Sequence, residues 1–261
     1  QTDGYRLSDV SVGNSWNASS NSYVGWNWLG ANGTASNSDG DLDSTVSANT
    51  TAGFSIVSYN SGSSASSNQT VGHGLGVVPK MIIAKNREAT GVWCVYHADV
   101  GNTKRLVLNT TAAEATNAVW GDTTPTSSVF TQRITTSNDI DIIAYCFAEV
   151  EGYSKFGTYT GNGDADGRFV FTGFRPAWVM TKRTDSAKDW IILDNKRDVD
   201  NVAQARLFPN LSDAESTAQS PMDILSNGFK LRVSDSNYDA SGGTWIYMSF
   251  AEMPFKYANA R

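Results

Sequence analysis

Short apolar segments separated by turn-forming residues are the main pattern along this chain. Glycine, asparagine, aspartate and serine dominate the stretches between these segments, as is typical of strands joined by turns. The only helix-like stretches are single short turns near residues 111–115 and 212–217. The pattern predicts an all-β protein built of antiparallel sandwiches rather than of alternating strands and helices. The segments rich in β-branched and aromatic residues are 54–59, 81–85, 93–96, 105–108 and 142–147.

This pattern occurs twice along the chain. The offset between the copies drifts by a few residues, as insertions in loops between strands would make it do. A unit of about 100 residues is far too long for a solenoid repeat. The sequence therefore predicts tandem duplicated β-sandwich domains, jelly-roll or lectin-like, at residues 53–152 and 153–261. Three segments of the first copy return in the second: 79–85 as 176–182, 93–96 as 190–193, and 145–149 as 248–252.

Residues 1–29 resemble the final hairpin of a further unit whose front half is missing. The segment 4–7 resembles 228–231, and the segment 23–28 resembles 245–250. We therefore expect an orphan β-hairpin ahead of the two full units. Since the chain starts at a glutamine without an initiator methionine or a signal peptide, we expect it to be the end of a longer string of units. The alternative is a hairpin that completes a sheet in another copy of the chain.

The connections between these parts differ in length and composition. Residues 30–52 are almost wholly glycine, alanine, asparagine, serine, threonine and aspartate, which predicts a linker or a long surface loop. The junction between the two full units, at residues 149–154, is short by contrast. A short joint predicts that the two sandwiches touch and move little relative to each other.

Composition and charge narrow the classes of partner. The 261 residues include 23 glycines, 18% charged residues and 40% apolar residues, enough apolar material for two cores of ordinary size. No apolar run approaches the ~18 residues that a membrane span needs, so no membrane insertion is expected. The formal charge of −6, with no cluster of lysine or arginine in the sequence, argues against nucleic acid and anionic membranes as partners.

The two cysteines, Cys94 and Cys146, do not form a disulfide framework. Their counterparts in the second copy are Ile191 and Ser249, whereas a structural disulfide would be expected in both copies. We interpret them as buried thiols that behave as small hydrophobic residues. Their oxidation state, and with it the redox compartment, stays open at this point.

Several strings in the sequence resemble one group of phage proteins. They are Val-Gly-His-Gly-Leu-Gly-Val-Val-Pro at 71–79, the segment 145–157, Thr-Gly-Phe-Arg-Pro at 172–176 and Phe-Lys-Tyr-Ala at 255–258. Together they are similar to the C-terminal region of large tail-fibre-like or virion-associated proteins of tailed phages that infect marine bacteria and cyanobacteria. The resemblance covers essentially the whole chain. It implies an appendage on the virion surface, outside the cell, and it carries no catalytic residues across.

Aromatic residues in turns are the candidates for sugar binding. Carbohydrate sites on sandwiches stack a tryptophan or tyrosine face on a sugar ring and surround it with polar groups. Trp93 and Trp190 recur at equivalent positions, which favours core packing for that pair. Trp120 has no duplicate and lies among turn formers, so we expect it to be the binding platform, together with Tyr96 or Tyr238. The alternative for Trp120 is a loop anchor.

Acidic residues suggest two further kinds of site. Asp164 and Asp166 have the oxygen density of a calcium loop but lack the distal glutamate of an EF-hand, so weak Ca²⁺ binding is the most we expect, with Asx turns as the alternative. Glu149 and Glu151 share a strand face, and glycoside hydrolysis requires two nearby carboxyls. The second copy keeps only Glu252 of that pair. We therefore interpret the repeated glutamate as a structural feature.

No catalytic centre emerges from the remaining residues. His73 and His97 are the two histidines of the chain, and neither has a partner at metal-ligand spacing. The sequence also has no nucleophile elbow and no phosphate-binding loop. It therefore predicts a protein that is not an enzyme and that requires no cofactor.

These features together predict a non-enzymatic module of a phage virion appendage that mediates or supports attachment to a host-surface glycan. The expected partners are host cell-surface polysaccharide and other virion proteins, and a homotrimer is as compatible with the sequence as a monomer. One alternative is a structural decoration module of the capsid or tail without a ligand. A polysaccharide depolymerase is a more distant alternative.

Overall fold

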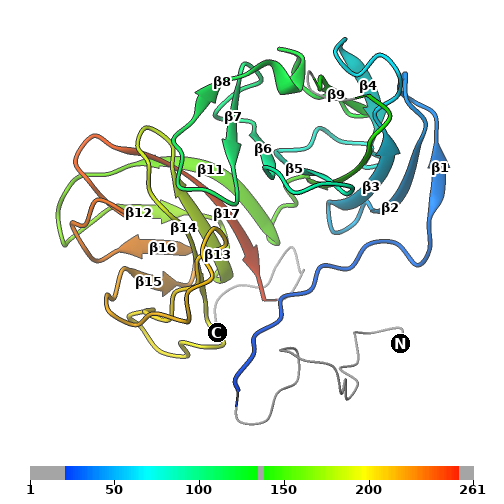
Figure 1. Ribbon diagram of the computed structural model, residues 1–261. Coiled ribbons are helices and arrows are strands. Elements are labelled where there is room, and N and C mark those ends of the chain that lie inside the picture. The colour runs from blue at the N-terminus through cyan, green and yellow to red at the C-terminus, as the bar shows by residue number, and fades with distance from the viewer. Residues whose placement is uncertain (1–20, 135–137, 253–261) are drawn as a thin grey trace.

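The computed structural model describes residues 21–134 and 138–252 of the chain. Within these ranges the regular elements are strands, apart from one short 3-10 helix, η1 (Ala118–Trp120). The antiparallel sheets and their layered packing confirm the predicted all-β sandwich architecture (Figure 1). In the part of the chain that is described, no helix is long and apolar enough to cross a bilayer.

The first half of the chain forms one large sheet, the first central sheet. A two-stranded sheet of β4 (Gln69–Gly72) and β9 (Val129–Gln132) covers one of its faces. The eight strands of the first central sheet are, in spatial order, β1 (Ala35–Asn37), β2 (Ser44–Asn49), β3 (Phe54–Asn60), β10 (Asp141–Phe147), β5 (Met81–Asn86), β6 (Cys94–His97), β7 (Lys104–Val107) and β8 (Ala115–Thr116).

The second half repeats this plan with fewer strands. A three-stranded sheet covers one face of a four-stranded sheet, the second central sheet. The covering sheet contains β12 (Phe169–Phe171), β16 (Gly228–Leu231) and β15 (Met222–Leu225) in that order. The second central sheet contains β11 (Ser154–Thr160), β17 (Thr244–Ala251), β13 (Pro176–Arg183) and β14 (Trp190–Asp194) in that order.

The strand pairings follow the duplication seen in the sequence. The order β3-β10-β5-β6 in the first central sheet corresponds to β11-β17-β13-β14 in the second. Phe147 lies opposite Met81 in the first sheet, and Phe250 lies opposite Trp178 in the second. Met81 and Trp178 occupy the same place in the repeated segments 79–85 and 176–182, and Phe147 and Phe250 occupy the same place in 145–149 and 248–252. The two halves are therefore structural copies in register as well as in strand order.

Both central sheets are buried on both faces. Successive side chains of a strand point to opposite faces of its sheet. In β10, Phe147 lies in one core and Cys146 in another, and in β17 Met248 and Tyr247 are divided in the same way. The molecule thus has four layers, with the two central sheets in the middle. Strands buried on both sides explain why the apolar runs in the sequence are continuous rather than alternating.

The middle core, here called the shared core, joins the two units face to face, and Figure 1 shows the two central sheets meeting between the halves. The rings of Phe147 and Phe250, one from each unit, lie 6.1 Å apart. The sandwiches therefore touch, as the short junction predicts, and they do so over whole sheet faces. The buried members of the shared core are Phe54, Met81, Ile83, Val95, Leu106, Phe147, Phe156, Trp178, Met180, Trp190, Ile192, Ile246, Met248 and Phe250.

The predicted N-terminal hairpin is not present in the residues that can be described. Its first part, residues 1–20, lies outside the described ranges, and residues 21–29 contain no strand. This segment instead runs across the seam between the units, where the Trp28 ring lies 5.3 Å from that of Trp178 and 5.4 Å from that of Phe250. The physical reason is that large aromatic rings lose more contact with water against the shared core than in an isolated hairpin.

The prediction of a linker at residues 30–52 is wrong, because β1 and β2 lie within that range and extend the first central sheet. β2 pairs with β3 along its whole length. Val46 supplies the only buried apolar side chain of β2, and the buried Ser44 hydroxyl donates to the Gly72 carbonyl at 2.8 Å. A strand anchored mainly through backbone and hydroxyl hydrogen bonds has the composition of a loop, which is why the apolar pattern missed it.

We expect Phe250→Ala to destabilise both units together. Phe250 is 5% exposed in the shared core, and truncating a buried phenylalanine costs about 3–5 kcal/mol. Because both units contribute to this core, calorimetry should record one transition at a lower Tm. Phe171→Ala is the matched control, since Phe171 is 61% exposed, and its Tm should stay close to that of the parent. Separate melting of the two units in the Phe250 variant would contradict the shared core.

Trp28→Ala is expected to lower the free energy of unfolding by about 2 kcal/mol, because its ring contacts aromatic rings of both units. Leu29→Ala is the control, since the neighbouring Leu29 is 70% exposed and its truncation should change stability by less than about 0.5 kcal/mol. Denaturant unfolding of both variants measures the difference. Equal stabilities would show that the 21–29 segment does not support the seam.

Candidate functional site

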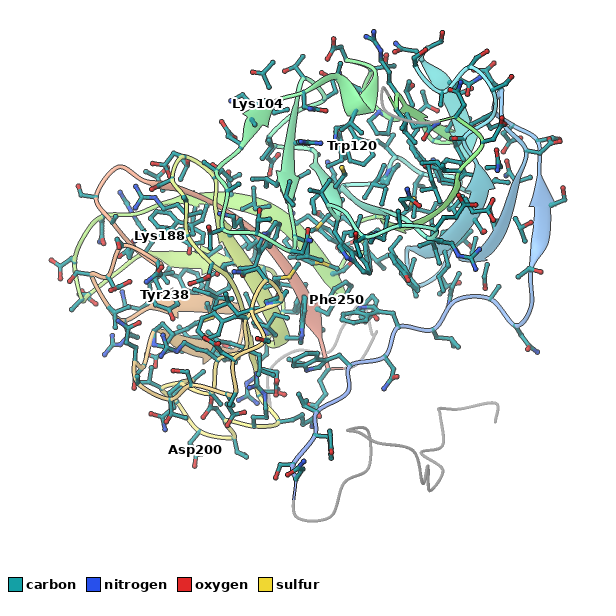
Figure 2. All side chains as sticks on the ribbon, viewed as in Figure 1. Lys104, Trp120, Lys188, Asp200, Tyr238 and Phe250 are labelled. Carbon is teal, nitrogen blue, oxygen red and sulfur yellow. The ribbon has the colours of Figure 1, made fainter. Side chains whose placement is uncertain are left out.

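The aromatic residues predicted to stack on sugars are all buried. Trp120 and Tyr96 are each 2% exposed, and Tyr238 is 1% exposed; Figure 2 labels Trp120 in the first unit and Tyr238 in the second. A stacking platform must present its ring face to solvent. The prediction of exposed platforms is therefore corrected: turn residues flank these rings in the sequence, but the rings themselves pack inward.

Local turn geometry directs the Trp120 ring inward. Asn117 caps η1, and its side-chain oxygen accepts from the Val119 N–H at 2.9 Å. Gly121 ends the turn with φ of 60°, a left-handed conformation that glycine adopts at little cost. The indole then packs edge-on against Tyr96, with ring centres 5.9 Å apart and an interplanar angle of 68°. Trp120 and Tyr96 thus lie together, whereas Tyr238 belongs to the other unit.

Trp120 also forms part of the wall of a pocket of about 410 Å³. The pocket lies between the first central sheet, which provides residues of β3, β5, β6, β7 and β10, and the opposite wall formed by η1 and residues 132–134. This volume falls within the range of small-molecule sites. The pocket is lined by apolar side chains such as Ile142 and Val119, with a small number of polar groups among them.

Two nearly buried side chains of the pocket have N–H groups without a hydrogen-bond partner in the described structure. They are Nε1 of Trp120 and Nε2 of Gln132, on residues that are 2% and 3% exposed. The other end of the Gln132 amide accepts from the Tyr59 hydroxyl at 3.4 Å. An unsatisfied buried donor costs about 1–3 kcal/mol. The wall of the pocket therefore contains two buried donors that lack an acceptor in the described chain.

The charged residues that line the pocket are Lys85, Arg105 and Arg133. The Lys85 side chain leaves the opposite face of β5, the face of Met81 and Ile83, so the positive groups offered to the pocket are the two arginines. Within the described residues none of the three forms an ion pair, and no aspartate or glutamate lines the pocket. Arg133 Nε donates to the Ser66 carbonyl at 2.9 Å. Arg105 Nη1 lies 3.8 Å from the sulfur of Cys94, which is a weak acceptor. In a chain of net charge −6, this wall is locally cationic.

The second unit holds an arginine at the equivalent place but surrounds it with oxygen atoms. Leu106 pairs with Val95 of β6, and Leu207 pairs with Ile192 of β14. Arg105 and Arg206 come directly before these two leucines, so they occupy equivalent positions. The Arg206 guanidinium donates to the Tyr238 hydroxyl at 2.6 Å. It also donates to side-chain oxygens of Gln219 at 2.9 Å and Ser216 at 2.8 Å. Tyr238 is thus an internal partner of Arg206.

Loop length accounts for part of this difference. Tyr238 lies in the connection between β16 and β17, residues 232–243. The corresponding connection of the first unit, residues 133–140 between β9 and β10, is shorter in sequence. The first unit therefore has no counterpart of the tyrosine that fills this space in the second. Sequence reasoning missed Arg105, Gln132 and Arg133, although the strand offsets could have aligned the two arginines.

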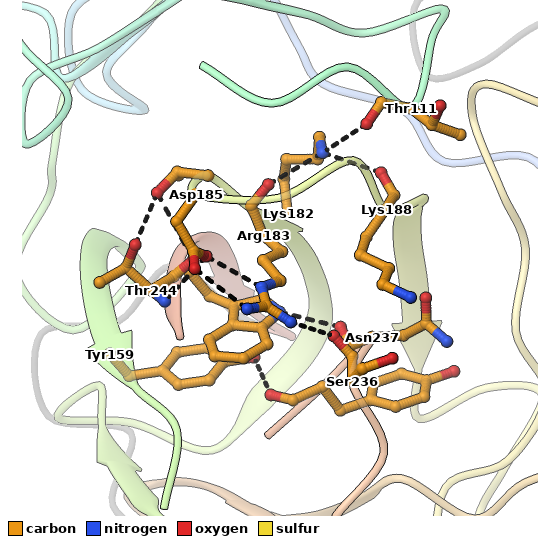
Figure 3. Close-up of polar contacts among 12 residues, drawn as sticks. Thr111, Tyr159, Lys182, Arg183, Asp185, Lys188, Ser236, Asn237 and Thr244 are labelled. Carbon is orange, nitrogen blue, oxygen red and sulfur yellow. Dashed lines mark hydrogen bonds and ion pairs between the residues drawn. The ribbon is translucent and has the colours of Figure 1, made fainter. Parts of the chain in front are cut away.

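A second pair of duplicated cations shows the same contrast. Lys182 is fully buried, and Figure 3 shows it donating to the Thr111, Arg183 and Lys188 carbonyls, at 3.1, 2.8 and 2.8 Å. Burial lowers the pKa of Lys182 to about 8. Its duplicate Lys85 donates to two carbonyls of its own hairpin and is only half-buried. The Lys182 cluster is a structural link between the units.

The proposed calcium loop is an Asx turn with a salt bridge. The Asp164 carboxylate accepts from the Asp166 N–H at 2.9 Å, and the Asp166 carboxylate pairs with Lys230 at 3.0 Å. That lysine holds the pKa of Asp166 below its usual range. No group of three potential metal ligands occurs in the described residues. The turn alternative thus describes the geometry, since a cation would have to displace Lys230.

The other sequence candidates lie outside the pocket. His73 and His97 are 0% and 1% exposed, and burial lowers the pKa of His97 to about 4. Glu149 pairs with Lys155 at 2.7 Å, and its duplicate Glu252 pairs with Lys196. The Glu149 pair therefore joins the end of the first unit to β11 of the second, whereas the Glu252 pair lies within the second unit.

Cys94 provides a chemical probe of the pocket. Both cysteines are free, Cys146 is buried and Cys94 lines the pocket. Burial raises the pKa of both thiols, so the reactive thiolate is scarce near neutral pH. We expect iodoacetamide to label Cys94 slowly, faster as the pH rises above about 9, and to spare Cys146 until the protein unfolds. Mass spectrometry checks this; labelling at the rate of a free thiol at pH 7 would contradict the enclosed site.

Comparison with known proteins assigns the chain to a family. No curated protein and no solved structure matches it. One family, described as a domain of unknown function (DUF7483), matches residues 1–254. Since that match spans nearly the whole sequence, the chain belongs to the DUF7483 family.

Proposed function

We propose that this chain is a non-enzymatic attachment module of a phage virion appendage, and that it binds a host-surface glycan in the pocket of the first unit. The observation that carries this proposal is the pair of unpartnered donors, Trp120 Nε1 and Gln132 Nε2, in the wall of a pocket that also has apolar side chains. Sugar hydroxyl and ring oxygens are acceptors, and sugar C–H faces suit apolar walls. A glycan therefore satisfies both kinds of surface at once.

The make-up of the pocket favours binding over cleavage. Glycoside hydrolysis uses two carboxyl groups that flank the scissile bond. No carboxylate lines the pocket within the described residues. The repeated Glu149 and Glu252 are each paired with a lysine elsewhere. These observations support glycan attachment over the alternative hypothesis, a polysaccharide depolymerase.

The assignment to a phage virion rests on the sequence resemblance alone. The proposed location and partners of the chain follow from that assignment. In that context the chain is carried on the virion surface, next to other virion proteins, and host cell-surface polysaccharide is its partner. A homotrimer is compatible with this arrangement. The second candidate function is a structural decoration module without a ligand. The shared core favours it, because it makes the two sandwiches one stiff body suited to act as a spacer.

Gln132→Leu tests the proposal. By the pairings of β4 with β9 and of β12 with β16, Gln132 corresponds to Leu231 of the second unit, so leucine suits this position in the fold. We expect retention on immobilised host polysaccharide to fall about fivefold through loss of one hydrogen bond. Thermal stability should stay within about 1 kcal/mol of the parent. The polysaccharide should keep its length after contact with the protein.

Gln69→Leu is the matched control, because Gln69 lies opposite Gln132 in the same two-stranded sheet and does not line the pocket. Its retention should equal that of the parent chain. Equal retention of both variants would remove the pocket from the binding function. Absence of any retention of the parent chain would support the decoration candidate, and shortened polysaccharide would overturn the non-enzymatic proposal.

A further inference from the structure

We infer that the pocket of the first unit selects an acidic sugar, a uronic acid ring whose carboxylate binds the Arg105 guanidinium. This inference rests on the proposed glycan function and adds the chemical class of the ligand. It goes beyond general sugar binding because any sugar has oxygens that accept from the two unpartnered donors, whereas the positive arginines of the pocket favour a ligand with a negative charge.

Local charge is the first argument. The whole chain carries a formal charge of −6, yet the charged side chains at the pocket are those of two arginines, Arg105 and Arg133. Within the described residues no acidic side chain lines the pocket to offset them. Positive groups gathered against a low-dielectric wall attract anions far more strongly than the same groups on an open surface. A neutral ligand would gain no charge–charge attraction from these side chains, whereas an anion would.

The duplicated arginine supplies the second argument. In the second unit, the Arg206 guanidinium is held by three side-chain oxygens, those of Tyr238, Gln219 and Ser216. In the first unit, the described residues give the Arg105 guanidinium one side-chain hydrogen bond, to the Cys94 sulfur at 3.8 Å. A guanidinium presents donors in a planar fork that matches the two oxygens of a carboxylate. The ligand carboxylate thus takes the place of the oxygens that the second unit provides internally.

The remaining donors account for the sugar ring. Trp120 Nε1 and Gln132 Nε2 line the same pocket and have no partner in the described chain. Hydroxyl oxygens of the ring can accept from both of them, while Ile142 and Val119 contact its apolar face. One uronic acid ring therefore meets the cationic, donor and apolar parts of the pocket together. A simple anion such as acetate would meet only the first.

The test compares two ligands that differ only at the carboxyl group, where the ester replaces the negative charge by a methyl group. Galacturonic and glucuronic acid oligosaccharides and their methyl esters are titrated calorimetrically into the full chain, in low salt. We expect the acids to bind about tenfold or more tightly than the esters, as a charge-assisted contact should. Bound acid should also slow alkylation of Cys94, which lies beside Arg105, and thereby report occupancy of this pocket.

Arg105→Gln is the diagnostic variant, and Arg87→Gln is its matched control. Arg87 is exposed and does not line the pocket, so both changes remove one positive charge but only one removes the proposed contact. Arg105→Gln should abolish the tenfold preference for the acid over the ester, whereas Arg87→Gln should keep it. If Arg105→Gln lowers Tm markedly, Arg105→Lys, which keeps the charge without the fork, should retain part of the preference.

The outcomes separate this inference from the proposed function. Retention on host polysaccharide with equal binding of acids and esters would overturn acid selection and leave glycan attachment standing. Binding of a sulfated neutral oligosaccharide as tight as that of the acids would overturn the assignment of a carboxylate. Failure of every oligosaccharide, together with loss of retention on host polysaccharide, would overturn both proposals.

Discussion

The shared core between the two central sheets is the contact on which the rest of the structure depends. Phe147, Trp178 and Phe250 belong to it, and without the partner unit each sheet would expose a broad face of large apolar residues to water. Each half is a sandwich of two sheets, but one face of its central sheet is buried only by the other unit. The short junction at residues 149–154 suffices, since packing rather than the linker sets the relative position of the units.

This arrangement leaves only the outer faces free to differ between the copies. In the second unit the outer core is closed, with Tyr238 on Arg206 and three oxygens around that guanidinium. In the first unit the equivalent Arg105 lies in the wall of a pocket. Two unsatisfied donors there cost about 1–3 kcal/mol each, and the large shared core offsets such a loss. The structural difference between the copies at this arginine thus lies in the outer layers, away from the shared core.

The strands and the duplication could be predicted from the sequence, but the sheet faces that pack together and the directions of single side chains could not. Runs such as 142–147 identified strands, and the offsets between repeats identified the duplication. Which strands pair, with Phe147 opposite Met81 and Phe250 opposite Trp178, came from the structure. The strand β2 was missed because hydroxyl and backbone hydrogen bonds anchor it in place of apolar side chains. The ring of Trp120 was expected to face solvent, since the turn formers around it describe its backbone and not the direction of its side chain.

Two properties could be derived from the sequence: the chain is all-β, and its strand pattern is duplicated. They follow from the strand propensity of short segments and from the repetition of these segments, and both can be recognised from residues close together in the sequence. The tertiary structure alone decided that the two sheets pack face to face, that Trp28 lies on their seam, and that Arg105 has a pocket where Arg206 has partners. Those outcomes depend on residues far apart in the chain, which become neighbours only when the sheets stack.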